Sequence, residues 1–254
     1  MATIKVTRPG RSGRVIEADD GANLLPVLLA EGFEVPHLCH HEAVEPYGAC
    51  RLCLVEVEKR GKRKLTTACN YPIADGIRVF LDTDKVVSNR QMVLELTLAN
   101  SPTPPALRRL AAEHGVALSD VRFQRDEDNT CILCGLCTRV CEKVCGGAIT
   151  TLGRGDQKRV GTPGDLPSEL CIGCASCAYV CPTDHIQVHE TKLLRTIWQR
   201  EFRKLACTRC GKTTITEDQR DYLVENRGYL PDYFELCHEC KRAAVVANFA
   251  AVGR

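Results

Sequence analysis

Near the start of the chain, apolar and polar residues alternate in short runs, which is the pattern of half-buried β-strands. The alternation predicts a hairpin over residues 3–18 and a further strand over residues 76–79. Turn residues at 60–61 predict a second hairpin. A short helical pattern over residues 23–31, closed by a Gly, lies between the hairpins. Strands around a single helix predict a small α+β module.

Longer apolar periods farther along the chain indicate helices. They predict one helix over residues 84–99 and a shorter one over 106–114, separated by a Pro-rich break. Residues 192–205 also place apolar side chains on one helical stripe, so an amphipathic helix is expected there. Packing against the chain's own core is its favoured role. A docking face for another subunit stays open, because the chain's only tryptophan, Trp198, lies in this stripe.

Cysteine is the unusual residue in the composition: the chain of 254 residues contains 17, and only 5% of its residues are aromatic. Metal bound by thiolates can supply the folding energy that a small apolar core cannot. The N-terminus carries neither a secretory nor a twin-Arg signal pattern. No apolar run approaches the ~20 residues that span a bilayer. We therefore expect a cytoplasmic protein without a transmembrane segment, whose cysteines bind metal rather than form disulfides.

Charge excludes one class of partner. The net charge is only +2, and acidic and basic residues are interspersed along the chain. Proteins that bind nucleic acid concentrate basic residues on one face or in one segment. We therefore expect no nucleic-acid partner.

One cysteine motif, C-x2-C-x2-C-x3-C, occurs twice, at Cys131–Cys141 and at Cys171–Cys181. This is the bacterial spacing for two [4Fe–4S] clusters, in which the fourth cysteine of each run binds the cluster of the other run. An internal repeat of eight cysteines at ligand spacing is not explained by packing or by disulfides. The expected ligands are Cys131, Cys134, Cys137 and Cys181 for the first cluster, and Cys171, Cys174, Cys177 and Cys141 for the second.

Four more cysteines lie on loops of the N-terminal module with the spacing C-x10-C-x2-C-x15-C: Cys39, Cys50, Cys53 and Cys69. The pattern is close to the plant-type [2Fe–2S] spacing, with a longer first gap. On spacing alone zinc competes, because C-x2-C pairs also build zinc sites. Three histidines, at 37, 40 and 41, flank the first cysteine. Packing or hydrogen bonding is favoured for them over Rieske-like ligation, because four cysteines already complete a site.

The strings around these cysteines resemble a known N-terminal module, found in the G subunit of bacterial complex I, the diaphorase U subunit of NAD-reducing hydrogenases, iron-only hydrogenases and NAD-dependent formate dehydrogenases. The strings are Pro36-His37-Leu38-Cys39-His40-His41, Gly48-Ala49-Cys50-Arg51-Leu52-Cys53-Leu54-Val55-Glu56-Val57 and Thr67-Ala68-Cys69. The resemblance covers about residues 1–190. It implies a β-grasp ferredoxin-like fold for the module and a [2Fe–2S] cluster, rather than zinc, on its four cysteines.

The helical connector departs from the family at one position. In the relatives, the equivalent of Leu98-Ala99-Asn100 is usually followed by a His and three cysteines that bind a further [4Fe–4S] cluster. Ser101 stands where that His would be, and no cysteine occurs between Cys69 and Cys131. The resemblance therefore implies one cluster fewer in this chain, with the helices kept as scaffold.

The tail from about residue 191 lies outside the resemblance and carries two more C-x2-C pairs, formed by Cys207, Cys210, Cys237 and Cys240. The pairs resemble the knuckles of a zinc ribbon with a wide insert, and a closed site of four thiolates is structural. Zinc is favoured, with a further iron–sulfur cluster as the alternative. Cys145 is left over: it is expected to be a buried residue near a cluster or an alternative ligand to Cys141.

The expected fold class is α+β, in four parts. These are a [2Fe–2S] ferredoxin-like domain (1–83), a helical connector (84–119), a 2×[4Fe–4S] ferredoxin domain (120–190) and an amphipathic helix with a four-cysteine zinc-ribbon-like module (191–254). The sequence has no G-x-G-x-x-G after a strand, no P-loop and no acid–base or nucleophile constellation. We therefore expect no active site of its own.

The favoured function is electron transfer within a multisubunit cytoplasmic oxidoreductase. By analogy with the relatives, a flavin subunit that handles NAD(H) stands at one end of the path. A catalytic subunit, such as a hydrogenase, a molybdenum or tungsten enzyme or another reductase, stands at the other, which makes the assembly a hetero-oligomer. The alternatives are a free-standing multi-cluster ferredoxin and a redox-sensing regulator that binds nucleic acid through the zinc ribbon. The near-neutral charge argues against the regulator.

Overall fold

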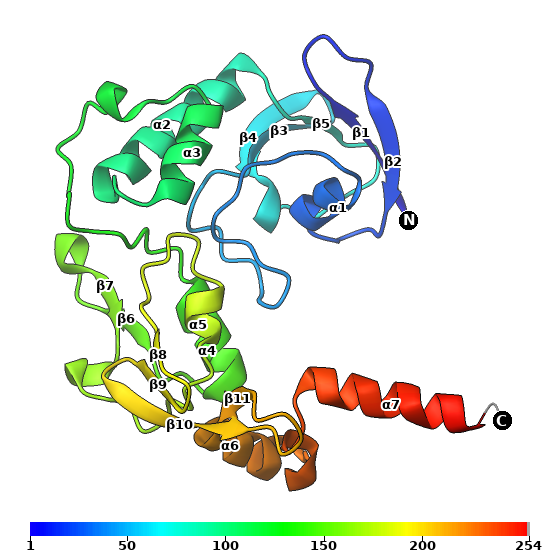
Figure 1. The fold of residues 1–254 in the computed structure, drawn as a ribbon. Helices are drawn as coiled ribbons and strands as arrows, with labels where there is room; N and C mark the ends of the chain where they lie inside the picture. The colour runs from blue at the N-terminus through cyan, green and yellow to red at the C-terminus, as the bar shows by residue number, and fades with distance from the viewer. Residues whose placement is uncertain (253–254) are drawn as a thin grey trace. The chain divides into compact units, whose positions relative to one another are not determined.

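The structure is a computed structural model that describes residues 1–252, with side chains described as far as Ala247. The chain divides into two compact units: Met1–Leu136 with Cys181–His185, and Cys137–Val180 with the chain from Ile186 onward. The helices are α1 (Leu24–Ala30), α2 (Asp84–Asn100), α3 (Pro105–Glu113), α4 (Leu136–Cys145), α5 (Ser176–Tyr179), α6 (Glu217–Arg227) and α7 (His238–Val252). The strands are β1 (Ala2–Thr7), β2 (Arg14–Ala18), β3 (Leu54–Lys59), β4 (Lys62–Thr67), β5 (Arg78–Phe80), β6 (Thr150–Leu152), β7 (Arg159–Gly161), β8 (His189–Glu190), β9 (Leu194–Ile197), β10 (Arg200–Ala206) and β11 (Thr213–Thr216) (Figure 1). Within the described residues, no helix combines the length and the apolar character needed to cross a bilayer.

The first unit is built on a sheet with the strand order β2-β1-β5-β3-β4. Strand β1 is antiparallel to β2 and parallel to β5, and β3 is antiparallel to both β4 and β5. Helix α1 lies against this sheet (Figure 1), because Leu24, Leu25 and Leu28 join side chains of β1 and β3 in one buried core. The hairpins and the short helix predicted from the alternation pattern are confirmed.

Helices α2 and α3 pack on each other and form a second apolar core. Leu94 and Leu98 of α2 and Leu107 of α3 are buried there together with Leu52, which belongs to the loop before β3. Both predicted helices are confirmed, and their bounds differ from the expected ones by a single residue at most. The connector thus supports the loop that carries cysteines of the N-terminal module.

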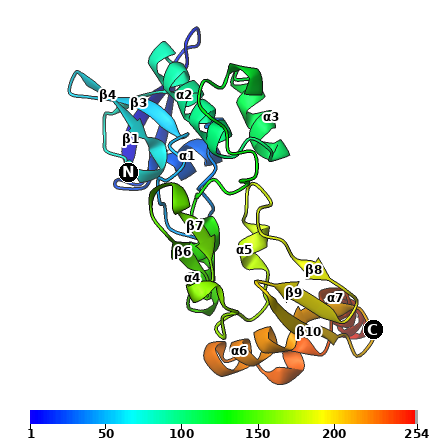
Figure 2. The same ribbon diagram turned by 90° about the vertical axis from the view of Figure 1, so that its left-hand side faces the viewer.

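The second unit contains the β6–β7 pair, helices α4 and α5, and a sheet with the strand order β11-β10-β9-β8. Neighbouring strands of this sheet are antiparallel, and α6 packs against β10 and β11 (Figure 2). Ile197 of β9 and Phe202 of β10 are its fully buried apolar side chains. Thr216 is the N-cap of α6, and its hydroxyl accepts a hydrogen bond from the backbone N–H of Gln219 at 3.1 Å.

The amphipathic helix predicted over residues 192–205 is wrong. These residues form β9 and β10, which are joined by a two-residue turn at Trp198 and Gln199. Both turn residues have a positive φ, 51° and 61°, which lies outside the right-handed helical region. The chain therefore reverses direction in the middle of the apolar stripe.

Charge pairing across the strands explains why the sheet forms. Glu190 of β8 accepts hydrogen bonds from Arg195 of β9 and from Lys204 of β10, which brings three strands together. Side chains at 200, 202 and 204 are covered while those at 201 and 203 are exposed, so β10 follows the period of a strand. Over so short a segment the apolar residues fit the period of a helix as well as that of a strand. The cross-strand pairs decide between the two, because they form only in the sheet.

Replacing Arg90 tests how α2 is fixed to the first sheet. Its guanidinium is buried and donates to the Asp82 carboxylate at 2.9 Å and to the Leu54 carbonyl at 2.7 Å. Arg90→Ala leaves both acceptors without this donor inside the protein, and we expect a loss of roughly 3 kcal/mol in the free energy of unfolding, measured by urea denaturation. Arg78→Ala is the control, because Arg78 is half exposed in its pair with Glu58, and a pair of this kind contributes less than about 1 kcal/mol. Equal losses in the two variants would contradict this reading.

Candidate metal centres

Cys39, Cys50, Cys53 and Cys69 converge in the first unit, from loops around β3 and β4. A hydrogen bond from the Cys50 thiol lowers the pKa of Cys39 to about 5. The pKa of Cys53 is raised, first by its hydrogen bond to Cys69 and then by burial. The charge on Cys39 acts on Cys53 and Cys69 as well, so the two pairs lie within one electrostatic environment. Two hydrogen-bonded pairs of cysteines that act on each other electrostatically form a donor set that suits a metal centre.

Backbone N–H groups point at these sulfurs. The N–H of Cys50 donates to the Cys39 sulfur at 3.4 Å, and the N–H of Leu38 donates to the Cys50 sulfur at the same distance, 3.4 Å. The loop can adopt this path because Gly48 has a φ of +75°. Hydrogen bonds to thiolate sulfur stabilise the negative charge of an iron–sulfur site, so this environment fits such a cluster.

The three histidines beside Cys39 make contacts with the protein. The Nδ1 atom of His37 lies 2.8 Å from the Val35 carbonyl oxygen, and that of His41 accepts a hydrogen bond from the Ala43 N–H at 3.1 Å. The rings of His37 and His40 meet edge to face, with centroids 5.5 Å apart. These contacts favour the packing role expected from the sequence over ligation.

Part of the first four-cysteine run belongs to the same unit. Burial raises the pKa of Cys134 to about 11, and the charges of Cys181, Cys131 and Cys39 add to this rise. The Cys131 sulfur accepts a hydrogen bond from the Leu133 N–H at 3.4 Å. Cys131, Cys134 and Cys181 thus lie in one electrostatic environment, and the charge of Cys39 in the N-terminal set acts on Cys134.

Two asparagines fix the start of this run to the end of α2. The side chain of Asn129 accepts from the Cys131 N–H at 2.9 Å and donates to the carbonyls of Asn100 and Cys131. The Asn100 side chain donates to the Cys131 carbonyl at 3.0 Å. Ser101, the next residue, is fully buried, and its hydroxyl has no hydrogen-bond partner in the described part of the chain. Sequence reasoning missed this clamp, because neither asparagine stands in a ligand motif.

In the second unit, Cys141 of the first run lies with three cysteines of the second run around one small cavity. The cavity is lined by Cys141, Cys145, Ala148, Ile149, Cys171, Ile172, Cys174, Ala175, Ser176, Cys177, Ile197 and Trp198. Burial raises the pKa of Cys177 to about 11, and the Trp198 indole N–H, 3.5 Å from its sulfur, opposes this rise. Sulfur ligands in an otherwise apolar lining fit an iron–sulfur cluster.

Cys145, the surplus cysteine, is buried at the edge of the same cavity. Its sulfur lies 3.6 Å from that of Cys141 and 3.5 Å from the Cys141 carbonyl oxygen. The hydrogen bond between the two sulfurs lowers the pKa of Cys141 and raises that of Cys145. Cys145 is therefore near the expected cluster ligands, and Cys141 is the member of the pair that ionises first.

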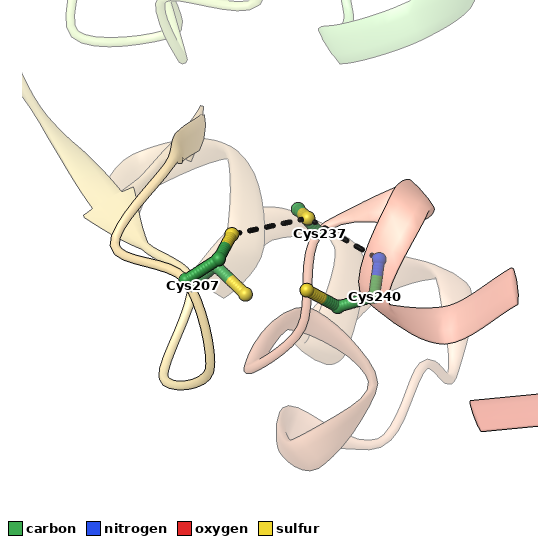
Figure 3. A group of neighbouring side chains, drawn as sticks. Cys207, Cys237 and Cys240 are labelled. Carbon is green, nitrogen blue, oxygen red and sulfur yellow. Dashed lines mark hydrogen bonds between the residues drawn. The ribbon is translucent and has the colours of Figure 1, made fainter. Parts of the chain in front are cut away.

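The four C-terminal cysteines form a compact group in which all the sulfurs lie within 4.8 Å of one another: Cys207, Cys210, Cys237 and Cys240. The labelled side chains in Figure 3 point toward a common centre. The first pair lies in the turn between β10 and β11, and the second lies at the start of α7. The second pair therefore opens a helix, so the likeness to a zinc ribbon is limited to the first knuckle. A closed set of four thiolates fits a structural metal ion.

Comparison with known protein families identifies both cluster domains. The 2Fe-2S iron-sulfur cluster binding domain family matches residues 11–84, and the 4Fe-4S dicluster domain family matches residues 130–185. The chain thus contains a 2Fe-2S domain and a 4Fe-4S dicluster domain. The region of the C-terminal sheet and the four-cysteine group lies beyond both matches.

Curated relatives are subunits of oxidoreductases. The chain is 29% identical over 222 residues to the NADPH-Fe(3+) oxidoreductase subunit alpha of Geobacter sulfurreducens, a match that covers 78% of this chain and 26% of that protein. It is also 29% identical over 236 residues to the G 2 subunit of NADH-quinone oxidoreductase from Rhizobium meliloti, with coverage of 82% and 27%. The chain therefore spans about a quarter of the length of these relatives.

A solved structure of an oxidoreductase also resembles the chain. A chain of an NAD+-reducing [NiFe]-hydrogenase, in its H2-reduced state, superimposes with a TM-score of 0.58 and 26% sequence identity. The match covers 72% of this chain and 86% of that one. The resemblance inferred from the cysteine strings is thereby confirmed.

Substitution of Gly48 tests the loop geometry around Cys39. A Cβ at this position would lie 2.4 Å from the Asn70 side-chain nitrogen, next to Cys69, and the positive φ adds strain of roughly 1–2 kcal/mol. We expect Gly48→Ala to lose at least half of the [2Fe–2S] EPR signal of the reduced protein. Gly61→Ala is the control, because Gly61 has a φ of +74° but nothing within 4 Å of the added Cβ. Equal signals in the two variants would exclude a role for the close approach at Gly48.

Proposed function

We propose that this chain, which carries a 2Fe-2S domain and a 4Fe-4S dicluster domain, works as the iron–sulfur electron-transfer subunit of a multisubunit oxidoreductase. The observation that carries the proposal is the convergence of cysteine sulfurs on loops of these two domains. Iron–sulfur clusters take up and release single electrons, and their potentials depend on charge, hydrogen bonding and exposure at the sulfurs. The relatives, which are subunits of NAD(P)H oxidoreductases, support the same reading.

The proposed ligand sets follow the sequence spacing, and the Cys39–Cys50 and Cys53–Cys69 pairs and the cavity around Cys141 support parts of them. Cys39, Cys50, Cys53 and Cys69 hold the [2Fe–2S] cluster; Cys131, Cys134, Cys137 and Cys181 hold the first [4Fe–4S] cluster; Cys141, Cys171, Cys174 and Cys177 hold the second. The shared cavity supports crossed ligation at Cys141, because this cysteine reaches it from the other run. Cys145 is assigned as a buried neighbour that donates to Cys141.

Electrons pass directly between the N-terminal set and the first run in this proposal. The charge of Cys39 acts on Cys134, and both belong to the first unit, which supports a short path between the two sulfur sets. Leu38, Cys50 and Ile132 all pack against the same apolar core, so the two ligand loops share one support. With Ser101 at the connector position, the chain needs no intermediate cluster between these two sets.

The proposed partners are a flavin subunit that handles NAD(H) and a catalytic oxidoreductase subunit, in a cytoplasmic hetero-oligomer. Relatives whose names include NADPH, NADH and NAD+ reduction support the first partner. The second partner is proposed from the sequence of the chain. Its motifs supply cysteine ligands but include no substrate-binding motif, so the substrate reaction is assigned to another subunit.

For the C-terminal group we propose a structural zinc ion held by Cys207, Cys210, Cys237 and Cys240. The four sulfurs already lie within 4.8 Å of one another, and they form a closed donor set. The site joins the β10–β11 turn to the start of α7. Its role is to hold the C-terminal sheet and helix together.

Iron content and complex formation test the electron-transfer function. We expect about ten iron atoms per chain and a reducible [2Fe–2S] EPR signal. The complex purified from the native host is expected to contain flavin, and NADH is expected to reduce the clusters in the complex but not in the isolated chain. Cys53→Ala is expected to lose about two iron atoms and the [2Fe–2S] signal, whereas Cys145→Ala retains all the iron. A cluster-loaded chain that purifies alone, without flavin, would support a free-standing ferredoxin instead.

Metal analysis of C-terminal variants tests the zinc site separately. We expect about one zinc ion per wild-type chain, and its loss in Cys240→Ser with the iron content unchanged. Cys145→Ala serves as the matched control, because it removes a buried thiol outside the C-terminal group. A loss of about four iron atoms in Cys240→Ser would instead identify an iron–sulfur cluster.

A further inference from the structure

A side chain from beyond the matched dicluster domain reaches a proposed cluster ligand. Trp198 stands at the turn between β9 and β10, and its indole N–H donates to the Cys177 sulfur at 3.5 Å. Its neighbour Ile197 lines the same cavity and is buried. The dicluster match ends at residue 185, so the hairpin that supplies both side chains is an addition to that domain.

The sheet around Trp198 is fastened to the loop of the second run by hydrogen bonds to backbone carbonyls. Arg200 donates to the carbonyls of Ser168, Glu169 and Cys171 at 3.1, 2.9 and 2.8 Å. Arg195 donates to the Gly173 carbonyl at 2.7 Å. These hydrogen bonds come from both strands that flank the turn, so they fix the position of the ligand loop relative to the hairpin.

Two further contacts close the arrangement. The buried hydroxyl of Thr216 donates to the Ile172 carbonyl at 2.6 Å. Gly173 packs so tightly on Phe202 that a Cβ there would lie 2.6 Å from the ring. The ligand loop therefore fits the C-terminal sheet without room for another heavy atom at this position.

The turn itself is held in an uncommon backbone conformation. Trp198 and Gln199 are non-glycine residues with φ of 51° and 61°. This left-handed pair is a hairpin turn normally built from Asn or Gly, and a bulky residue there costs free energy. Backbone strain of this kind persists where surrounding contacts hold the strained conformation. Here the strained residue is Trp198, whose side chain is directed at the Cys177 sulfur.

We propose that Trp198 is a positioning residue that raises the reduction potential of the second [4Fe–4S] cluster and, with Ile197, keeps water from it. An N–H directed at a ligand sulfur stabilises the more negative, reduced state of the cluster relative to the oxidised state. Apolar cover at the cavity limits solvent access, which is a second control on potential. This inference rests on the proposed second cluster.

Potentiometric titration of the cluster-loaded chain, followed by EPR, tests the proposal. In Trp198→Phe the ring is partly kept and the N–H is removed. We expect one of the two [4Fe–4S] midpoints to fall by an amount corresponding to a tenfold smaller one-electron reduction constant, about 59 mV. The [2Fe–2S] midpoint and the other [4Fe–4S] midpoint are expected to stay at their wild-type values.

A control and a second variant keep the test decisive. Tyr179→Phe removes a hydroxyl from an exposed aromatic in the same run and is expected to leave every midpoint unchanged. Because Trp198 is the only tryptophan in the chain, residue-wide replacement by benzothienylalanine exchanges only this indole N–H for sulfur while keeping a bicyclic ring. The same downward shift is expected with this analogue, even if Trp198→Phe loads the cluster poorly.

The outcomes separate this inference from the proposed function. Full iron content with unchanged midpoints in the benzothienylalanine protein overturns the role of Trp198 and leaves the cluster assignment intact. Wild-type protein that lacks a second [4Fe–4S] signal overturns the cluster assignment itself. A shift of all three midpoints by the same amount would indicate a general structural effect and would also overturn the specific role of Trp198.

Discussion

The crowding of buried cysteine sulfurs is the constraint on which the rest of the structure depends. Neighbouring sulfurs cannot all ionise without metal: the pKa of Cys39 falls to about 5, while that of its partner Cys50 is raised. A bound metal centre removes this conflict by taking several thiolates at once. The tight loops, the N–H groups directed at sulfur and the apolar cavity linings all follow from that requirement.

The parts of the fold and of the site that depend on local sequence could be predicted. Ligand spacing within a C-x2-C motif is fixed by the geometry of one loop, so spacing alone predicts the four sets of cysteines. The alternation over β1 and β2 and the helical period of α2 are local as well, and both elements form as expected. The sequence also indicates the departure from the family pattern at Ser101, because this departure concerns a single position next to a recognisable segment.

Features that depend on long-range contacts could not be predicted. Residues 192–205 fit a helical stripe, but Arg195 and Lys204 both pair with Glu190 on another strand, and this pairing stabilises a sheet. The clamp of Asn100 and Asn129 on Cys131 joins residues that no motif relates. In each case the deciding partner is distant along the chain or lies outside any ligand pattern, so neither period nor spacing reports it.

The hydrogen bonds from the C-terminal sheet to the second ligand loop also join parts of the chain that are synthesised at different times. Carbonyls at 168–173 are held by side chains that leave the ribosome later, the last of them at Thr216. All the cysteines of the second run are therefore synthesised before the sheet that orders their loop. The hydrogen bonds to the carbonyls of this loop are therefore complete only once β11 has been synthesised. The loop that carries three of the expected ligands is thus completed by a segment that supplies none of them.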